Sequence, residues 1–227
     1  MTLWSHSSPS PSPSANPPTL REPVVYVVDD DASMRQALDG LLRSIGLQVQ
    51  TFETSQDFLA SAKRDVPGCL VLDVRLRGES GLTLQEQMEK TGVRIPIVFM
   101  TGHGDIAMTV KAMKAGAVDF LAKPFRDQDM LDAVASALAR DSARLLAEQS
   151  GAVMRQAYET LTVREREVLS FVIVGLMNKQ IAAQLNLSEV TVKVHRGQMM
   201  KKLSARSVAD LVRIAEALGI EPARRNA

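Results

Sequence analysis

The stretch Cys69-Leu70-Val71-Leu72-Asp73 is an apolar run that ends in a single carboxylate, and Pro67-Gly68 lies directly before it. An apolar run of this length between a turn signal and an acid is typical of a buried parallel strand. In an open parallel sheet, ligands bind outside the carboxyl ends of the strands. Asp73 is therefore a candidate for chemistry, although an acid at such a position more often forms a turn or caps a helix.

Apolar runs and helical patterns alternate along the chain on both sides of this strand. Strands are predicted at residues 24–28, 47–51, 96–100 and 117–121, and helices at residues 32–45, 55–63, 81–90, 106–115 and from 127 past 140. Residues 74–80 are expected to form a loop. The alternation predicts the α/β class, with a flavodoxin-like, five-stranded parallel sheet and right-handed crossovers.

The composition excludes several classes of protein. With 227 residues the chain is long enough for two modest domains, and its hydrophobic share of 45% and charged share of 23% are ordinary for a globular protein. It has no apolar run near the ~20 residues that a membrane span requires, and no signal-peptide pattern. Its single cysteine, Cys69, cannot form an internal disulfide, so we expect a cytoplasmic protein without a membrane partner.

Composition and charge also divide the chain along its length. From Ser5 to Pro18, 11 of 14 residues are Ser or Pro, which predicts a disordered leader over residues 1–22. Residues 23–127 carry 12 basic and 14 acidic side chains, whereas residues 155–227 carry 12 basic and 7 acidic ones. The excess of positive charge at the C-terminal end favours an acidic partner there, and nucleic acid is the first candidate.

Polar side chains follow four of the predicted strands. Asp29 and Asp30 follow the first strand, Asp73 ends the third, and Thr101 and Lys123 follow the next two. In a parallel sheet these side chains meet at one edge. Three carboxylates there repel one another unless a divalent ion lies between them, and hard oxygen ligands suit Mg²⁺ or Mn²⁺. Taken singly, each residue has a simpler interpretation as a helix cap, a loop hydroxyl or a solvated lysine.

This combination of residue types predicts phosphoryl transfer to a carboxylate. Asp73 is the expected nucleophile, because a metal ion and Lys123 would neutralise the oxygens on which charge develops. Asp30 and Asp73 would bind the ion directly, and Asp29 would act largely through water. Thr101 would donate its hydroxyl to one phosphoryl oxygen, and Lys123 would pair with another.

Several segments resemble the receiver domain of two-component response regulators, and the resemblance covers about residues 23–127. The segments are Val27-Val28-Asp29-Asp30-Asp31, Leu72-Asp73-Val74-Arg75, Ser80-Gly81, Thr101-Gly102-His103-Gly104-Asp105, and Lys114-Ala115-Gly116-Ala117-Val118-Asp119-Phe120 followed by Lys123-Pro124-Phe125.

The resemblance implies that a sensor histidine kinase phosphorylates Asp73, and that Thr101 and Phe120 form a switch. Arg77 departs from the pattern, because receivers commonly have proline at this position. The metal ligands that the resemblance implies are the carboxylates of Asp29, Asp30 and Asp73 and the carbonyl of Arg75.

A second helical pattern occupies the basic C-terminal part. Thr162-Val163-Arg164-Glu165 is a capping-box arrangement that starts a helix ending near Gly175. Asn178 is expected to cap a second helix that ends at residue 185, and Ser188 a third that runs to about Leu203. A turn of about three residues between the second and third helices predicts a helix-turn-helix.

The third helix is predicted to have an inner and an outer face. Val192, His195, Met199 and Leu203 share the inner face, and His195 is interpreted as a core histidine. The outer face fits a DNA major groove, although charge alone would equally describe a solvated surface. The predicted DNA-binding residues are Lys179, Thr191, Lys193, Val194, Arg196, Gly197 and Lys201, with Lys202 as a further contact to the DNA backbone.

This part of the chain is similar to the four-helix DNA-binding domain of the LuxR/NarL family, and a helix over residues 207–218 would be its dimer helix. Together with the receiver pattern, it resembles FixJ-type regulators, including those of styrene and toluene catabolism. The segments that carry the resemblance are Leu161-Thr162, Arg164-Glu165, Glu167-Val168-Leu169, Gly175-Leu176-Met177-Asn178-Lys179-Gln180, Ile181-Ala182, Thr191-Val192-Lys193-Val194-His195-Arg196, Met200 and Lys202-Leu203.

We therefore predict a transcriptional regulator of a two-component system whose phosphorylation promotes homodimerisation and promoter binding. The expected partners are promoter DNA, a sensor histidine kinase, a second copy of the chain and RNA polymerase. Met108, Ala112 and Ala115 are expected on the solvent side of their helix, where a second copy would pair. The predicted segments are a leader (1–22), a receiver domain (23–140), a linker helix (141–158) and a helix-turn-helix domain (159–227).

Two alternatives remain open. The first is a DNA-binding regulator that acts without phosphorylation and has a degenerate receiver. The second is a metal-dependent phosphohydrolase with Asp73 as covalent intermediate. Such enzymes commonly have a second acid two residues after the nucleophile, and this chain has Arg75 there, which leaves no obvious general acid. We therefore expect no enzymatic turnover.

Overall fold

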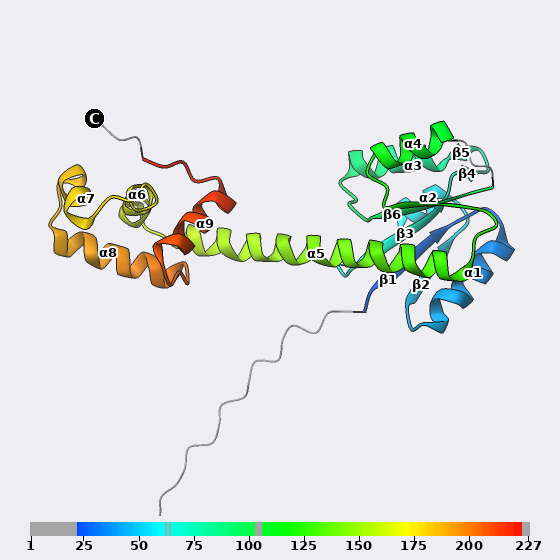
Figure 1. The fold of residues 1–227 in the computed structure, drawn as a ribbon, viewed down its shortest axis with the longest axis horizontal. Coiled ribbons are helices and arrows are strands. Elements are labelled where there is room, and N and C mark those ends of the chain that lie inside the picture. The colour runs from blue at the N-terminus through cyan, green and yellow to red at the C-terminus, as the bar shows by residue number, and fades with distance from the viewer. Residues whose placement is uncertain (1–21, 62, 64, 103–105, 224–227) are drawn as a thin grey trace, which may run out of the picture. The chain divides into compact units, whose positions relative to one another are not determined.

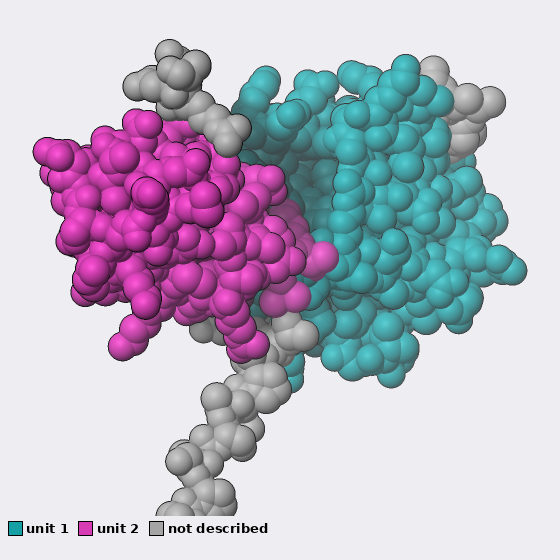
Figure 2. All heavy atoms as spheres, turned by 60° about the vertical axis from the view of Figure 1, so that its left-hand side comes forward, with its two compact units in different colours: residues 1–142 teal, residues 143–227 magenta. Residues whose placement is uncertain are grey.

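The computed structural model describes residues 22–61, 63, 65–102 and 106–223. Contacts divide the chain into two compact units, residues 1–142 and residues 143–227 (Figure 2). Almost all of the leader predicted from the Ser/Pro composition, and residues 103–105 of the loop after Thr101, lie outside the described residues.

The first unit is built on five parallel strands in the order β2-β1-β3-β6-β7 (Figure 1). This confirms the predicted flavodoxin-like sheet. The central strand β3 has a buried residue at all six positions, which explains why its sequence is continuously apolar. The strands are β1 (Val24–Val28), β2 (Gln48–Phe52), β3 (Gly68–Asp73), β6 (Ile97–Thr101) and β7 (Asp119–Ala122).

Helices cover both faces of the sheet (Figure 1). Alternate residues of β1 belong to different cores: Val24, Tyr26 and Val28 pack with one set of helices, and Val25 and Val27 with the other. The first set is α2 (Ser55–Ala60), α3 (Gly81–Thr91) and α4 (Ile106–Lys114), and the second is α1 (Ala32–Ser44) and α5 (Asp127–Glu159).

The segment after β3 differs from the prediction. Residues 74–80 contain a hairpin instead of a plain loop, in which β4 (Arg75–Leu76) pairs antiparallel with β5 (Glu79–Ser80). Arg77 and Gly78 form the turn, and Gly78 has φ +82°, a conformation that glycine adopts without strain. Each of these strands has only two residues, which is too short for an alternation of apolar and polar residues to reveal it in the sequence.

The α4 helix also differs from the prediction. Ala112 is fully buried in the core, and Met108 is half-buried and packs against the same cluster, so these residues do not face solvent as expected. Ala115 is exposed. The exposed apolar side chains of this helix are instead Val110 and Met113, at 45% and 43% exposure among the residues whose side chains are described.

Helix α5 is continuous from Asp127 to Glu159, and it includes the segment predicted as a linker helix. Its buried face in the first unit carries Ala133, Val134 and Ala137. One turn further on, the buried carboxylate of Asp141 accepts a hydrogen bond of 2.8 Å from the N–H of Gly68 at the start of β3. The buried carboxylate thus has a hydrogen-bond donor in the backbone at the start of a strand.

The second unit contains α6 (Val163–Val172), α7 (Asn178–Leu185), α8 (Glu189–Lys202) and α9 (Val208–Leu218). Residues 186–188 connect α7 to α8, as predicted for a helix-turn-helix. Thr162 forms the expected capping box with Glu165, and Ser188 caps α8. The core residues that these helices share include Val168, Leu169, Ile181, Val192, Met199 and Leu211.

Asn178 is not the cap of α7. It is the first residue of the helix, and the residue before it, Met177, occupies the cap position. The N–H of Met177 donates to Gln180 Oε1 over 2.9 Å. The Asn178 side chain instead accepts a bond of 3.0 Å from Arg196 of α8, so it joins two helices where local sequence rules predicted a cap.

Candidate functional site

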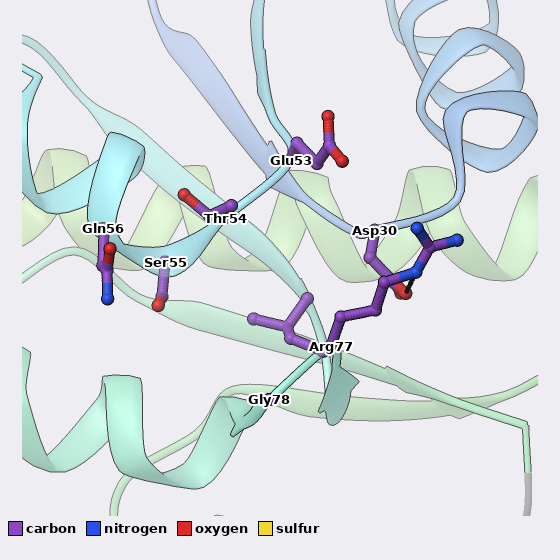
Figure 3. Close-up of a pocket in the computed structure, with 8 residues that line it drawn as sticks. Asp30, Glu53, Thr54, Ser55, Gln56, Arg77 and Gly78 are labelled. Carbon is purple, nitrogen blue, oxygen red and sulfur yellow. Dashed lines mark ion pairs between the residues drawn. The ribbon is translucent and has the colours of Figure 1, made fainter.

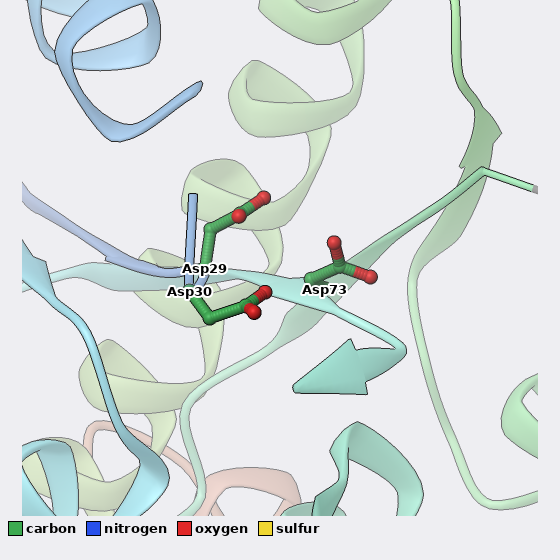
Figure 4. Close-up of side chains that lie close together, drawn as sticks. All are labelled: Asp29, Asp30 and Asp73. Atoms are coloured by element: carbon green, nitrogen blue, oxygen red, sulfur yellow. The ribbon is translucent and has the colours of Figure 1, made fainter. Parts of the chain in front are cut away.

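Three carboxylates from two strands meet at the carboxyl edge of the sheet (Figure 4). Asp29 and Asp30 follow β1, and Asp73 ends the neighbouring strand β3. Each offers an oxygen that lies within 4.8 Å of the others. The parallel pairing of β1 with β3 produces this convergence, because it aligns the ends of both strands at one edge.

Lys123 is the counter-charge of this cluster. Its Nζ lies 2.8 Å from Asp29 Oδ2 and 2.6 Å from Asp73 Oδ2, and its side chain is only 20% exposed. Burial lowers the pKa of Lys123, but its bonds to Asp29 and Asp73 outweigh burial and leave the pKa raised. The lysine follows the last strand β7, and its peptide bond to Pro124 is cis.

Asp29 is the most enclosed of the three acids, with no exposed surface. Burial raises its pKa, and the bonds from Lys123 and from the N–H of Asp31 only partly offset this effect. Asp31, in turn, caps α1 by accepting from the N–H of Ser33 over 2.8 Å. The alternative role of a helix cap therefore falls to Asp31, and Asp30 remains directed toward the cluster (Figure 4).

The backbone around Asp73 is closely packed. The N–H of Arg75 donates to Asp73 Oδ1 over 2.9 Å, which orients the carboxylate. On the other side, Gly81 at the start of α3 lies so close that a Cβ there would be 2.4 Å from the Asp73 carbonyl oxygen. Only glycine allows α3 to begin at this distance from the strand end.

Two arginines that the sequence analysis did not assign to the site lie beside the cluster. Arg35 of α1 donates to the Asp29 carbonyl oxygen over 2.7 Å and lies 3.8 Å from Glu53. Arg77, at the tip of the β4–β5 turn, places Nε 3.0 Å from Asp30 Oδ2 (Figure 3). Their contacts join segments that are distant in sequence, so no local sequence pattern predicts these contacts.

Asp30 and Arg77 also line a pocket of about 460 Å³ beside the cluster (Figure 3). Glu53, Thr54 and Gly78 line it as well, so the pocket lies between the segment after β2 and the β4–β5 turn.

The two predicted switch residues lie on adjacent strands, with Thr101 at the carboxyl end of β6 and Phe120 two residues before that edge in the register. Thr101 ends β6 and is 1% exposed, and its backbone carbonyl accepts from the N–H of Lys123. Phe120 of β7 is half-buried and stands opposite Phe99 in the register, with 6.4 Å between the ring centroids.

The donor set fits a hard divalent cation. The cluster contains three carboxylates and two nearby cationic side chains. Lys123 is hydrogen-bonded to two of the carboxylates, and the exposed Arg77 is paired with the third. The backbone of Arg75, whose carbonyl was predicted as a further ligand, is part of the segment that directly follows Asp73. Oxygen ligands of this kind suit Mg²⁺ or Mn²⁺.

The predicted DNA-binding face of α8 is exposed. Lys193, Val194, Gly197 and Lys201 are all exposed, and Val194 is an exposed large apolar residue at 50%. On the opposite face, Val192, Met199 and Leu203 are buried. His195 is half-buried, and its Nδ1 is buried without a hydrogen-bond partner among the described residues.

The other predicted DNA-contacting residues of this unit differ in their exposure and in their bonds within the protein. Lys179 is exposed, whereas Thr191 and Arg196 are half-buried and bonded to Ser188 and Asn178. Lys202 differs most from expectation. Its Nζ lies 2.7 Å from the buried Glu165 carboxylate and 3.1 Å from the Thr160 carbonyl, so it holds the start of α6.

Both parts of the chain match known families. Residues 25–135 match the family described as "Response regulator receiver domain", and residues 159–215 match "Bacterial regulatory proteins, luxR family". Nodulation protein W of Bradyrhizobium diazoefficiens is 55% identical over 197 residues, which cover 87% of each chain. The response regulator protein TodT of Pseudomonas putida is 47% identical over 203 residues, again 87% of each chain.

The chain is a LuxR-type response regulator. A solved structure of the response regulator StyR matches with a TM-score of 0.78 and 51% identity, and covers 86% of this chain and 98% of that one. Membership of this response-regulator family confirms the predicted fold class and the predicted function as a two-component transcriptional regulator. Across the described part of the chain, no helix combines the length and apolarity needed to span a bilayer.

Proposed function

We propose that Asp73 of this response regulator accepts a phosphoryl group from a sensor histidine kinase. The observation that carries the proposal is that Lys123 bonds to both Asp29 and Asp73 while Asp30 lies within 4.8 Å of them. An Asp73 oxygen attacks phosphorus and forms an O–P bond, the P–N bond to the kinase histidine breaks, and its electron pair remains on the imidazole nitrogen. The product is an aspartyl phosphate.

Asp29, Asp30, Asp73 and the Arg75 carbonyl would hold Mg²⁺ or Mn²⁺. When bound, the ion supplies positive charge to the phosphoryl oxygens. Lys123 performs the same task from the other side, since its raised pKa keeps it charged at neutral pH. The N–H of Arg75 fixes the carboxylate plane of Asp73, which orients the attacking oxygen.

Thr101 is proposed to donate its hydroxyl to the phosphoryl group, and Phe120 to turn inward as Thr101 moves. Both residues belong to neighbouring, hydrogen-bonded strands, so a shift of one affects the surface of the other. The altered surface of β7 and α4 would then bind a second copy of the chain.

Promoter DNA is the proposed target of the second unit. A dimer places two α8 helices about one DNA turn (~34 Å) apart in successive major grooves. Bound there, the regulator is proposed to contact RNA polymerase, in the cytoplasm where the promoter lies. Lys193, Val194, Gly197 and Lys201 are exposed on α8, which supports base and phosphate contacts by this face. Lys179, Thr191 and Arg196 would add contacts to the DNA backbone.

Asp73→Asn tests the acceptor. The variant keeps the shape of the side chain but lacks the nucleophilic charge, so we expect no acid-stable, base-labile incorporation of phosphate from acetyl phosphate and Mg²⁺. The matched control is Asp57→Asn, which alters an exposed acid of α2. Equal incorporation by Asp73→Asn and wild type would refute the assignment. Wild-type protein that incorporates phosphate but binds promoter DNA equally with and without it would support the phosphorylation-independent alternative.

The phosphohydrolase alternative makes a different prediction. It requires turnover of a phosphate ester in excess over protein, and a general acid near Asp73. The residue two positions after Asp73 is Arg75, whose exposed side chain is not an acid. We therefore expect each phosphorylated chain to release at most one phosphate. Colorimetric detection of free phosphate measures this release.

A further inference from the structure

Arg77 forms an ion pair with one carboxylate of the acidic cluster. Its Nε lies 3.0 Å from Asp30 Oδ2, and this carboxylate is one of the three that converge (Figure 3). A guanidinium and a divalent cation seek the same lone pairs of a carboxylate. Asp30 therefore has a protein cation as partner where an ion would bind.

The β4–β5 hairpin explains why Arg77 reaches Asp30. The pairing of Arg75 with Ser80 and of Leu76 with Glu79 leaves Arg77 and Gly78 as a two-residue turn. Leu76 is buried at 9% exposure and anchors the hairpin in the core. The turn is thus fixed in place, and the long side chain of Arg77 extends from it toward the end of β1 (Figure 3).

The Arg77–Asp30 pair is open to solvent on the arginine side. The Arg77 side chain is 80% exposed, whereas that of Asp30 is 23% exposed. An ion pair with one partner in open solvent contributes little and is screened by salt. Both residues line the pocket of about 460 Å³, so an ion and its water shell have access to Asp30 from this side, and the released guanidinium has room to leave.

The other cation of the site behaves differently. Lys123 is held by two carboxylates and is only 20% exposed, and neither of its partners is Asp30. Removal of Arg77 therefore frees Asp30 without disturbing the Lys123 bonds, and it also removes a positive charge that repels an incoming cation.

We propose that Arg77 competes with the divalent metal ion for Asp30 and so sets the metal concentration at which the receiver becomes competent for phosphorylation. The inference rests on the proposed metal site at Asp29, Asp30 and Asp73. Arg77→Gln removes the charge and keeps most of the side-chain length, and we expect it to tighten Mn²⁺ binding by roughly two- to fivefold at low salt.

The test measures free Mn²⁺ by electron paramagnetic resonance during titration of full-length protein, without phosphoryl donor. Arg164→Gln is the matched control, because it removes an exposed, ion-paired arginine from the second unit. The control is expected to bind Mn²⁺ as wild type does. The advantage of Arg77→Gln over wild type should shrink as the ionic strength rises to about 1 M, where charges are screened within a few ångströms.

The outcomes separate this inference from the proposed function. If wild type binds Mn²⁺, Asp73→Asn weakens that binding, and Arg77→Gln binds no more tightly than wild type, the metal site stands and the competition is refuted. If Asp73→Asn binds Mn²⁺ as wild type does, or wild type does not bind it, the proposed metal site fails and the inference fails with it. Tighter binding by Arg77→Gln but not by Arg164→Gln supports the competition.

Discussion

Gly81 illustrates how one residue fixes the geometry around Asp73, the proposed acceptor. A Cβ at this position would lie 2.4 Å from the carbonyl oxygen of Asp73 and 3.2 Å from the Cα of Val74. These are backbone atoms, which cannot rotate away as a side chain does. We expect Gly81→Ala to cost about 1–3 kcal/mol of unfolding free energy, as overpacking does, and to slow phosphorylation of Asp73.

Gly40→Ala is the control for Gly81→Ala. Gly40 lies on the exposed side of α1, and an added Cβ would have no atom within 4 Å. Alanine there should stabilise the protein by about 0.5–1 kcal/mol through its higher helix propensity. Urea unfolding followed by circular dichroism measures both effects. A Gly81→Ala protein as stable as wild type would contradict the close approach of α3 to the strand end.

Glu165 makes the second unit sensitive to acid. Burial raises the pKa of Glu165, but Lys202 and the N–H and hydroxyl of Thr162 outweigh it and leave the pKa lowered. A depressed carboxyl pKa contributes stability above the pKa of the unfolded chain, near 4.5, and this contribution disappears as pH falls through the lower folded value. Glu165→Gln should therefore cost about 1.5–3 kcal/mol at pH 7, and progressively less as the pH falls below the unfolded value of 4.5.

The comparison with Glu167→Gln identifies the cause. Glu167 forms an i,i+3 pair with Arg164, and its side chain is 38% exposed, so its loss should change stability little at any pH. Urea midpoints at several pH values between 3 and 7 provide the measurement for both variants. An equal loss for Glu165→Gln at all these pH values would show that the carboxylate charge is not what stabilises the unit.

At the scale of elements, α8 carries lysines with two different tasks. Lys193 and Lys201 are exposed on the outer face, whereas Lys202 is bonded to Glu165 and Thr160. Lys193→Ala should lower DNA affinity and reduce the slope of log K against log salt concentration by about 0.9, without changing the unfolding midpoint. Lys202→Ala should instead lower the midpoint. Fluorescence anisotropy with labelled promoter DNA, in a series of salt concentrations, tests the difference.

The sequence predicts those elements whose signal is local. The continuous apolar run at β3, the acids after β1 and β3, and the Thr162 capping box are each visible within a few residues, and the structure contains all of them. The parallel topology then follows from alternation of strands and helices. For this reason Asp29, Asp30, Asp73 and Lys123 can be brought together before any coordinates are known.

What the sequence does not reveal depends on contacts between distant segments. Asn178 has a residue type that favours caps, yet its side chain bonds to Arg196 in the next helix. Ala112 lies among lysines in sequence but is buried against the sheet. Arg77 reaches Asp30 because it lies in the turn of a short hairpin whose tip stands beside the end of β1. Such pairings are decided by packing, which periodicity does not encode.

At the scale of the whole molecule, β3 links the proposed phosphorylation site to α5. Asp73 is at the carboxyl end of this strand, and the N–H of Gly68 at its other end bonds to the buried Asp141 of α5. The same helix continues to Glu159, directly before the helices of the second unit. A single strand and a single helix therefore connect the acceptor with the part of the chain that precedes the DNA-binding helices.

Phosphorylation is expected to convert the monomer into a dimer that binds promoter DNA more tightly. Light scattering with Mg²⁺ and a phosphoryl mimic should show the mass rise from 24.7 kDa to about twice that value, because the altered α4 and β7 surface pairs with its copy. Asp73→Asn should remain monomeric under the same conditions.

Val110 and Met113 are exposed on α4, so Val110→Lys should block dimerisation while leaving phosphate incorporation intact. A wild-type protein that takes up phosphate at Asp73 yet stays monomeric, with unchanged DNA affinity, would refute the coupling and leave the two units as independent functions on one chain.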